Sequence, residues 1–277
     1  MRYEGRLPDE GINTSPEHPL REFAVLVGGF AGVAVVCTVA LALLIDRVVP
    51  LLPPELEAQL FGSWLASDEK EEDTVVDPRE ARVQEVLDRM AARWPDHPYT
   101  FRVSILEESE PNALAFPGGW IVVTEGLLDQ AESENELALV LGHELGHYAG
   151  RDHLRGLGRG VALSVVLGAM GSGGDVAAGL ASLASDLTGR RFDRDQESAA
   201  DAFGLALLHA EYGHVGGAGD FFARQARASE GEFGKEFGVY FSTHPQGGDR
   251  VEAIERLARE RGWRSRAVLE PLVFGPR

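Results

Sequence analysis

The chain has 277 residues, enough for one catalytic domain with a sizeable hydrophobic core and additional segments. Its formal net charge of -18 at pH 7 argues against a nucleic-acid-binding protein, because contacts with phosphate need clustered lysine and arginine. The single cysteine, Cys37, excludes an intramolecular disulfide framework. Nothing in the composition sets the oligomeric state.

The N-terminal part of the chain contains a long apolar segment. Residues 1–22 are polar and contain three prolines, which is typical of an extended tail. Residues 24–45 follow without a charged side chain, and as a helix they would span about 33 Å, enough for the hydrocarbon core of a bilayer. A cleaved signal peptide fits less well, because the run is long and no small-x-small cleavage site follows Ile45. We therefore predict one transmembrane anchor over residues 23–50.

Charges on the two sides of this segment indicate its orientation. Arg2, Arg6 and Arg21 precede it, whereas Arg47 follows closely and acidic residues dominate farther downstream. The positive-inside rule then favours a cytoplasmic N-terminus. The rest of the chain would lie on the extracytoplasmic side of the membrane, which is the periplasmic side in a bacterium.

Residues 51–76 are typical of a linker, because two consecutive prolines stop a helix and a run of charged side chains follows. The folded domain is predicted over residues 77–277. Its first helix would have Asp77 as the cap and Pro78 at the first helical position.

Short strands precede the central motif of this domain. Phe101–Leu106 alternates in the manner of a strand, and Asn112–Phe116 and Trp120–Val123 flank a Pro-Gly-Gly turn. We therefore expect a mainly α domain with a small β-sheet (α+β). An edge strand beside a metal site offers backbone groups to an extended peptide, so substrate binding by strand addition is the hypothesis. The substrate-binding residues would be Asn112, Ala113, Leu114 and Ala115.

The central motif is the pattern His-Glu-x-x-His within Leu141–Tyr148. On a helix, His143 and His147 lie one turn apart on the same face, so both imidazoles can reach one metal ion. Glu144 then lies beside the metal, where its carboxylate can take a proton from a water molecule that zinc activates. Upstream, Ser133–Glu136 has the form of a capping box, which favours a helix here. This arrangement is the signature of zincin metallopeptidases.

A catalytic zinc ion needs a third protein ligand and an open position for water. One candidate is Glu197, because Asp201 lies one helical turn later and could orient a ligand by accepting a hydrogen bond. The other is His153, which together with Gly150 completes the longer metzincin pattern. A metzincin also needs a methionine turn, and the downstream Met170 follows an apolar run rather than an evident tight loop. On the residues alone, both ligand sets stay open.

The order of these features resembles peptidase family M48, the HtpX and CAAX prenyl protease type of membrane-associated zinc peptidases. The matching stretches are Asn112–Ala115 with Pro117–Gly119, the central motif, Arg194 with Glu197 and Asp201, and His244–Pro245 with Arg250. The resemblance implies a mainly helical gluzincin fold, with one zinc ion held by His143, His147 and Glu197. It also implies Glu144 as the general base. The resemblance is greatest to bacterial members with one anchor and an extracytoplasmic domain.

The resemblance further implies that His244 approaches the active site. There a charged imidazolium could stabilise the oxyanion, or a neutral ring could occupy the open zinc position and hold the enzyme inactive.

Taken together, the sequence predicts a single-pass membrane protein with a zinc-dependent endopeptidase domain. Its substrates would be unfolded or extended protein segments, because strand addition depends on backbone more than on side chains. The alternative hypothesis is a chaperone or assembly factor that binds unfolded chains while its zinc site is normally latched.

Overall fold

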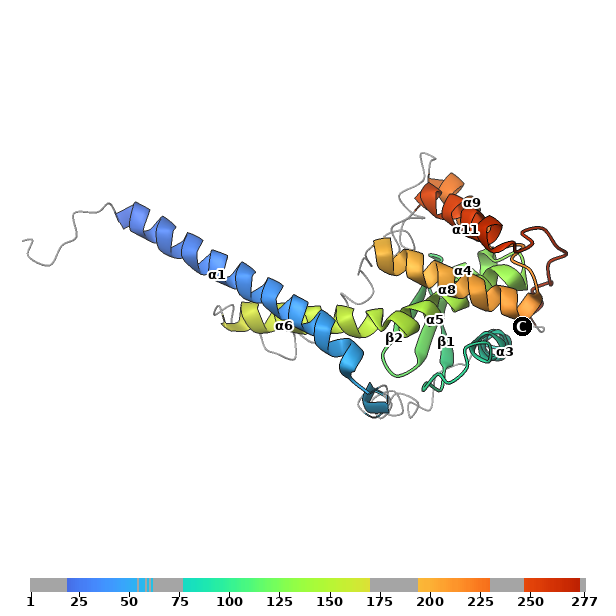
Figure 1. The fold of residues 1–277 in the computed structure, drawn as a ribbon, viewed down its shortest axis with the longest axis horizontal. Coiled ribbons are helices and arrows are strands. Elements are labelled where there is room, and N and C mark those ends of the chain that lie inside the picture. Colours follow the sequence, from blue (N-terminus) through green and yellow to red (C-terminus); the bar gives the residue numbers. More distant parts are fainter. Residues whose placement is uncertain are drawn as a thin grey trace, which may run out of the picture.

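The computed structural model describes residues 19–53, 55–57, 59, 61, 77–169, 194–229 and 247–274. Over these residues the protein is mostly helical and contains a three-stranded sheet, which confirms the predicted α+β class. A long helix, α1, projects away from the other elements, most of which gather around the sheet (Figure 1).

Helix α1 spans Pro19–Val48 and continues into a short 3-10 helix, η1, at Val49–Leu51. Among the described residues, this is the helical stretch that is long and apolar enough to cross a membrane, and no residue of its apolar window is buried. It begins inside the predicted tail of residues 1–22, because proline is tolerated in the first turn of a helix and no helix breaker follows Pro19.

The sheet contains β1 (Arg102–Leu106), β2 (Ala113–Phe116) and β3 (Trp120–Thr124), in the order β1-β3-β2. Strand β3 pairs in parallel with β1 and antiparallel with β2, so β1 and β2 are the two edges. All three strands agree with the predicted ranges to within one residue. The turn Pro117–Gly119 requires glycine, because Gly119 has a φ of 95° and a Cβ atom there would lie 2.5 Å from Thr100 O.

The other helices are α3 (Glu80–Ala91), α4 (Glu125–Gln130), α5 (Glu134–Gly150), α6 (Asp152–Ala169), α8 (Arg194–Tyr212), α9 (Asp220–Ser229) and α11 (Gly247–Arg261). The hydrophobic core lies between the sheet and helices α3, α5 and α8, and includes Val86, Ile121, Leu141 and Leu205. Helix α3 begins at Glu80, later than the predicted cap. Asp77 nevertheless accepts a hydrogen bond from Arg79 N at 2.8 Å, as a residue just before a helix does.

Helices α5 and α8 approach each other closely because small residues face each other at their contact. A Cβ atom built on Gly146 of α5 would lie 2.6 Å from Ala200 Cα of α8. One built on Gly204 of α8 would lie 2.7 Å from His143 N of α5. Only small side chains permit this separation, and it brings one turn of α8 against the central motif on α5.

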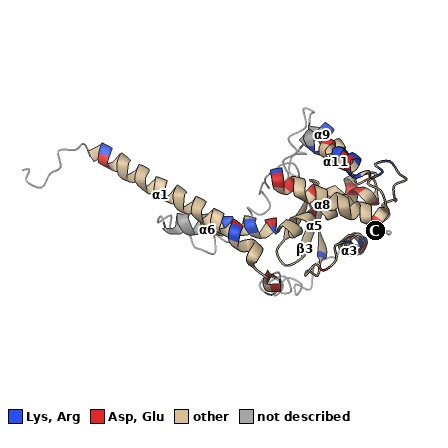
Figure 2. Ribbon diagram, viewed as in Figure 1, with Lys and Arg blue, Asp and Glu red and all other residues tan. Residues whose placement is uncertain are grey.

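Helix α6 leads back along α1 (Figure 1). Asp46 of α1 forms an ion pair with Arg159 of α6 at 2.7 Å, and Ile45 contacts Gly158 so closely that a Cβ atom there would lie 2.8 Å from its side chain. The ribbon in Figure 2 is coloured blue, for basic residues, where the two helices meet. The C-terminal end of the candidate membrane helix is thus fastened to the helix that follows the central motif.

The predicted linker, residues 51–76, is described at a few positions. One of them differs from a free spacer: Glu57 is 3% exposed and lies against the folded domain. The physical reason is that its carboxylate finds hydrogen-bond donors there, so a charged side chain can be buried.

Candidate metal centre

Helix α5, which carries the central motif, forms over Glu134–Gly150 with its predicted cap. Ser133 Oγ accepts a hydrogen bond from Glu136 N at 3.3 Å, and the Glu136 carboxylate turns back to accept one from Glu132 N at 3.0 Å. The helix ends at Gly150. The next residue, Arg151, takes the left-handed conformation and donates its N–H to the last turn of α5.

Three buried side chains converge within the core. Atoms of His143 and His147 on α5 and of Glu197 on α8 lie within 4.8 Å of one another and could hold a metal ion. The two Nε2 atoms are 3.0 Å apart, and the Glu197 carboxylate oxygens lie 3.5 Å from His143 Nε2 and 3.4 Å from His147 Nε2. All three residues are 0% exposed. The structure thus brings together the residues of the preferred ligand set.

Each imidazole is held by a carboxylate on its far nitrogen. His143 Nδ1 lies 2.8 Å from Asp201 Oδ1, and His147 Nδ1 lies 3.0 Å from Asp152 Oδ2. Sequence reasoning found Asp201 from its helical spacing to Glu197, but it missed Asp152. The available signal was an acidic residue two positions after the end of α5, where a reversal of the chain can bring it back to the last histidine.

The donor set fits zinc. An imidazole that donates Nδ1–H to a carboxylate directs the lone pair of Nε2 toward the opposite side, where a metal can bind. Two such nitrogens and one carboxylate are a known ligand set of catalytic zinc sites. Gln196 donates to the other oxygen of Asp152 at 2.7 Å, which fixes the carboxylate that orients His147.

A buried arginine balances the acidic groups. Arg250 of α11 is 0% exposed, and its Nη2 lies 2.5 Å from Asp201 Oδ1 and 2.8 Å from His143 Nδ1. Its guanidinium also lies over the Phe222 ring, 3.8 Å from the centroid. A cation bound at His143 Nε2 requires the tautomer in which Nδ1–H donates to Asp201, so Arg250 supports this carboxylate rather than the imidazole.

These contacts separate the pKa values of the two histidines. Burial and the charge of Arg250 lower the pKa of His143 to about 3. Burial also opposes protonation of His147, but hydrogen bonds with Asp152 and Glu197 and the charge of Glu144 outweigh it and raise its pKa to about 9. Because a metal competes with a proton for His147 Nε2, metal binding releases protons here.

Glu144 lies beside this cluster. It follows His143 on α5, is 1% exposed, and its charge contributes to the raised pKa of His147. Burial opposes ionisation of Asp201 as well, but the charge of Arg250 and the hydrogen bond with His143 outweigh it and lower the pKa of Asp201. The cluster is therefore a buried group of charged and polar side chains.

His153, the alternative third ligand, is not part of the cluster. Its Nε2 lies 2.7 Å from Glu57 Oε1 instead. After the left-handed Arg151, the chain enters α6 at Asp152, so this aspartate and not the following histidine faces His147. This geometry favours Glu197 over His153 as the third ligand. His244 and Pro245 lie outside the described residues.

The β1 edge of the sheet is covered by side chains of α3. The outward N–H of Val103 donates to Gln84 Oε1 at 2.8 Å, and the backbone of Ile105 hydrogen-bonds to the Glu80 carboxylate. Backbone groups of β1 that an extended peptide would pair with are therefore already hydrogen-bonded.

The β2 edge is different. Thr124 N donates to Asn112 O at 3.0 Å, and because hydrogen-bonded pairs alternate in an antiparallel ladder, the backbone groups of Ala113 and Ala115 point outward. The outward N–H of Ala113 donates to Asn112 Oδ1 at 2.9 Å. Among the described residues, no hydrogen-bond partner is found for the outward groups of Ala115. Within the part of the chain that the structure describes, the edge strand predicted from the sequence therefore has unpaired outward groups at Ala115, whereas the outward N–H of Ala113 already has an acceptor.

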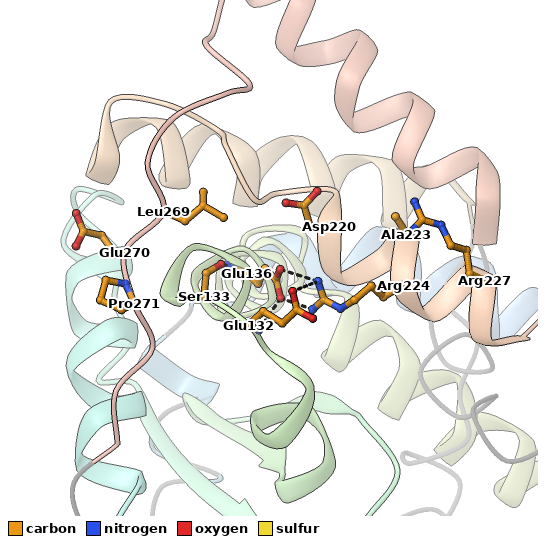
Figure 3. A pocket seen from close by; sticks show the side chains of 10 residues that line it. All are labelled: Glu132, Ser133, Glu136, Asp220, Ala223, Arg224, Arg227, Leu269, Glu270 and Pro271. Carbon is orange, nitrogen blue, oxygen red and sulfur yellow. Dashed lines mark hydrogen bonds and ion pairs between the residues drawn. The ribbon is translucent and has the colours of Figure 1, made fainter.

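A separate surface pocket of about 540 Å³ lies at the N-terminal end of α5 (Figure 3). Its most prominent polar group, Arg224, already donates to both oxygens of Glu136, at 2.5 and 2.9 Å, and to Gln130 O at 2.9 Å. Glu136 precedes His143 by two helical turns, so the pocket is distinct from the metal centre.

Comparison with known proteins identifies the family. The model of "Peptidase family M48" matches residues 77–258. The mitochondrial metalloendopeptidase OMA1 of Schizosaccharomyces pombe is 28% identical over 195 residues, which are 66% of this chain and 54% of that protein. OMA1 of Arabidopsis thaliana is 31% identical over 209 residues, covering 72% and 41%. Metalloprotease LoiP of Escherichia coli is 29% identical over 148 residues, covering 52% and 57%.

The chain therefore spans about half the length of these relatives, all of which are named as metalloproteases or metalloendopeptidases. The matched range includes the sheet, α5 and α8, and with them every candidate metal ligand. The chain belongs to peptidase family M48.

Proposed function

We propose that the protein is a membrane-anchored, zinc-dependent endopeptidase that hydrolyses peptide bonds in extended or misfolded proteins. The observation that carries the proposal is the buried convergence of His143, His147 and Glu197 in a chain of this family. These three side chains are the proposed zinc ligands, and residues 77–277 are the proposed peptidase domain.

Bound zinc would supply Lewis acidity, which polarises the scissile carbonyl and makes a water molecule acidic enough to attack near neutral pH. Glu144 takes the proton from the attacking water and later passes it to the leaving amine. Asp201 and Asp152 keep the two imidazoles oriented through their Nδ1 atoms. Loss of either carboxylate therefore weakens metal binding, whereas loss of Glu144 stops turnover and leaves the metal in place.

The substrate is proposed to bind as an additional strand beside β2, along Asn112–Ala115. The outward-facing backbone groups of Ala115 support this proposal, because a pairing strand would use them; at Ala113, the strand would replace the Asn112 side chain as the acceptor of the N–H. Recognition through the backbone favours unfolded or extended segments and imposes little side-chain preference.

His244 is proposed to reach the same site, either to stabilise the oxyanion or to latch the enzyme by occupying the open metal position. His244→Ala separates these roles. A fall in turnover indicates oxyanion stabilisation, and a rise in turnover with altered zinc affinity indicates a latch. If turnover and zinc affinity both stay unchanged, neither role holds.

The test of the enzymatic proposal uses the full-length protein in detergent micelles, loaded with zinc and given an unfolded protein such as casein. Wild type and Glu55→Gln, which alters an exposed carboxylate, should cleave it. Glu144→Gln should retain zinc but lose at least about 100-fold in turnover, the usual contribution of a positioned general base.

A chaperone or assembly factor remains the second candidate, since the open β2 edge can bind an extended chain whether or not the peptide bond is cut. If wild type and Glu144→Gln both bind zinc and unfolded protein and neither cleaves it, the peptidase proposal fails and this candidate replaces it.

Membrane attachment is proposed through residues 24–45 of α1, with the tail of residues 1–22 on the cytoplasmic side and the peptidase domain on the extracytoplasmic side. The apolar character of this helix, and the absence of buried residues from its apolar window, support a single-pass anchor. Alkaline phosphatase and green fluorescent protein fused after Arg277 test the orientation. An active phosphatase with a dark fluorescent protein is expected, and the opposite pattern contradicts it.

A further inference from the structure

A buried carboxylate joins the segment that follows the anchor to the folded domain. Glu57 is 3% exposed, and its two oxygens accept hydrogen bonds from three donors. Oε1 accepts from His153 Nε2 at 2.7 Å and from Gly118 N at 3.0 Å, and Oε2 accepts from Tyr99 Oη at 3.0 Å. Arg151 Nη2 lies 3.5 Å from Oε2.

Such a carboxylate is stable in the interior only because of these partners. Burial alone would raise the pKa of Glu57, but the hydrogen bond and charge of His153 and the hydrogen bonds from Gly118 and Tyr99 outweigh it and lower the pKa. The donors come from three separate parts of the chain: the turn between β2 and β3, the start of α6, and the segment before β1. Glu57 therefore holds these parts together at one point.

One of the three donors, Gly118, belongs to the turn that follows the edge strand β2. Gly118 lies in the turn Pro117–Gly119, which directly follows β2. The same turn is held from the other side by Tyr148 of α5, whose hydroxyl contacts Phe116 O and lies 2.9 Å from Trp120 O. Tyr148 follows the candidate ligand His147, so the turn is clamped between the metal helix and Glu57.

Aromatic contacts complete the clamp. The centroid of the Tyr148 ring lies 4.5 Å from that of His153 and 5.0 Å from that of Tyr99. Two of the three donors to Glu57 therefore also pack against α5. Arg151, at the end of that helix, donates to Val49 O at 3.0 Å and to Leu52 O. The segment that leaves α1 is therefore bound to the folded domain at Val49, Leu52 and Glu57.

We propose that Glu57 is a positioning residue for substrate binding. It lies in the segment next to the membrane anchor and holds the β2–β3 turn, and with it strand β2, at a set distance from the metal centre. This role rests on the proposed peptidase function. Displacement of about 1 Å between bound groups and catalytic groups is enough to lower rates strongly, so the placement of β2 relative to α5 matters. His153, which completes the metzincin pattern in the sequence, serves this clamp instead of the metal.

The experiment uses the full-length protein in detergent micelles and three variants. Glu57→Ala removes the acceptor, Glu57→Gln keeps an oxygen for Gly118 N or His153, and Glu55→Ala removes an exposed carboxylate from the same segment. Zinc content, kcat and KM for an unfolded substrate, and hydrogen exchange of the amides from Ala113 to Gly119 are measured for each. Hydrogen exchange reports on the clamp whether or not the protein is a peptidase.

For Glu57→Ala we expect full zinc content, a KM raised about tenfold, as loss of a hydrogen bond to a charged group implies, and faster exchange confined to β2 and its turn. Glu57→Gln should show a smaller change in the same direction, and Glu55→Ala none. A wild type that cleaves nothing contradicts the peptidase function, and the exchange data still decide the clamp.

Two results overturn the inference. One is unchanged exchange and unchanged KM in both Glu57 variants. The other is a parallel loss of zinc, kcat and thermal stability in Glu57→Gln, because that pattern indicates general structural support rather than positioning of the strand. If Glu57→Ala does not fold, Glu57→Gln alone decides between these outcomes.

Discussion

The close contact between α5 and α8 makes a sharp prediction about the metal centre. In Gly146→Ala, the new Cβ atom would lie 2.6 Å from Ala200 Cα and 2.8 Å from Ala200 O. Both are backbone atoms of α8, so no flexible side chain can move aside. The helix itself must retreat, and it carries Glu197 one turn before Ala200.

The size of the effect follows from these distances. Carbon atoms in contact prefer about 3.5 to 4.0 Å, so the helices must separate by about 1 Å at this point. Metal–ligand distances tolerate only about 0.2 Å, and Glu197 would no longer reach the same centre as the two histidines. Overpacking lowers the free energy of unfolding by about 1 to 3 kcal/mol, whereas replacing a helical glycine by alanine raises it by about 1 kcal/mol. The net loss of stability is therefore about 0 to 2 kcal/mol.

The assay compares zinc affinity, by competition with a chelating dye, and thermal unfolding for wild type, Gly146→Ala and Gly29→Ala. Gly29 lies on exposed α1 with nothing within 4 Å of its Cβ position, so it is the matched control. We expect Gly146→Ala to lose at least about tenfold in zinc affinity with a small change in the unfolding temperature, and Gly29→Ala to behave as wild type. Unchanged zinc affinity in Gly146→Ala would refute the idea that helix separation sets the ligand geometry.

Four further outcomes are expected. Asp152→Ala should lower zinc affinity about 10- to 100-fold, as measured by dye competition, because His147 Nδ1 loses its acceptor; an unchanged affinity contradicts this role. Ala115→Pro removes only an outward N–H and should raise KM while zinc content stays full; equal losses of both argue against strand addition. Chelation of zinc should lower the unfolding temperature, and added zinc should restore it, since a ligand of the folded state stabilises it. Folding lowers the pKa of Glu57, so its carboxylate stabilises the folded protein at neutral pH, and this stabilisation is lost as the pH falls through the pKa of the folded state. Urea unfolding should therefore show that Glu57→Gln is less stable than wild type at pH 7. The difference in unfolding free energy should shrink in acid.

The sequence determined the local parts of this protein. A spacing of four residues on a capped helix places His143 and His147 on one face whatever surrounds them, because helical geometry repeats every 3.6 residues. Alternation and a Pro-Gly-Gly turn were enough to locate the strands to within one residue. The long uncharged run likewise identified the helix that could cross a membrane.

Other features depended on contacts between distant residues. The choice between Glu197 and His153 as the third ligand could not be made from spacing, since both patterns are consistent with a metal site. In the tertiary structure, His153 lies against Glu57 after the left-handed Arg151, and the glycine contacts between α5 and α8 place Glu197 beside the two histidines. These contacts favour Glu197.

The burial of Glu57 shows most clearly that local sequence does not predict contacts between distant residues. Its segment begins with two consecutive prolines and ends in a run of charged residues over 67–73, so the composition of the segment as a whole indicates a linker. A charged side chain is buried only when donors surround it, and here the donors come from residues 42, 61 and 96 positions away. Local sequence determines which helices and strands can form, because their periodicity is local; only the packed fold decides which polar groups meet, because that depends on residues far apart in the chain.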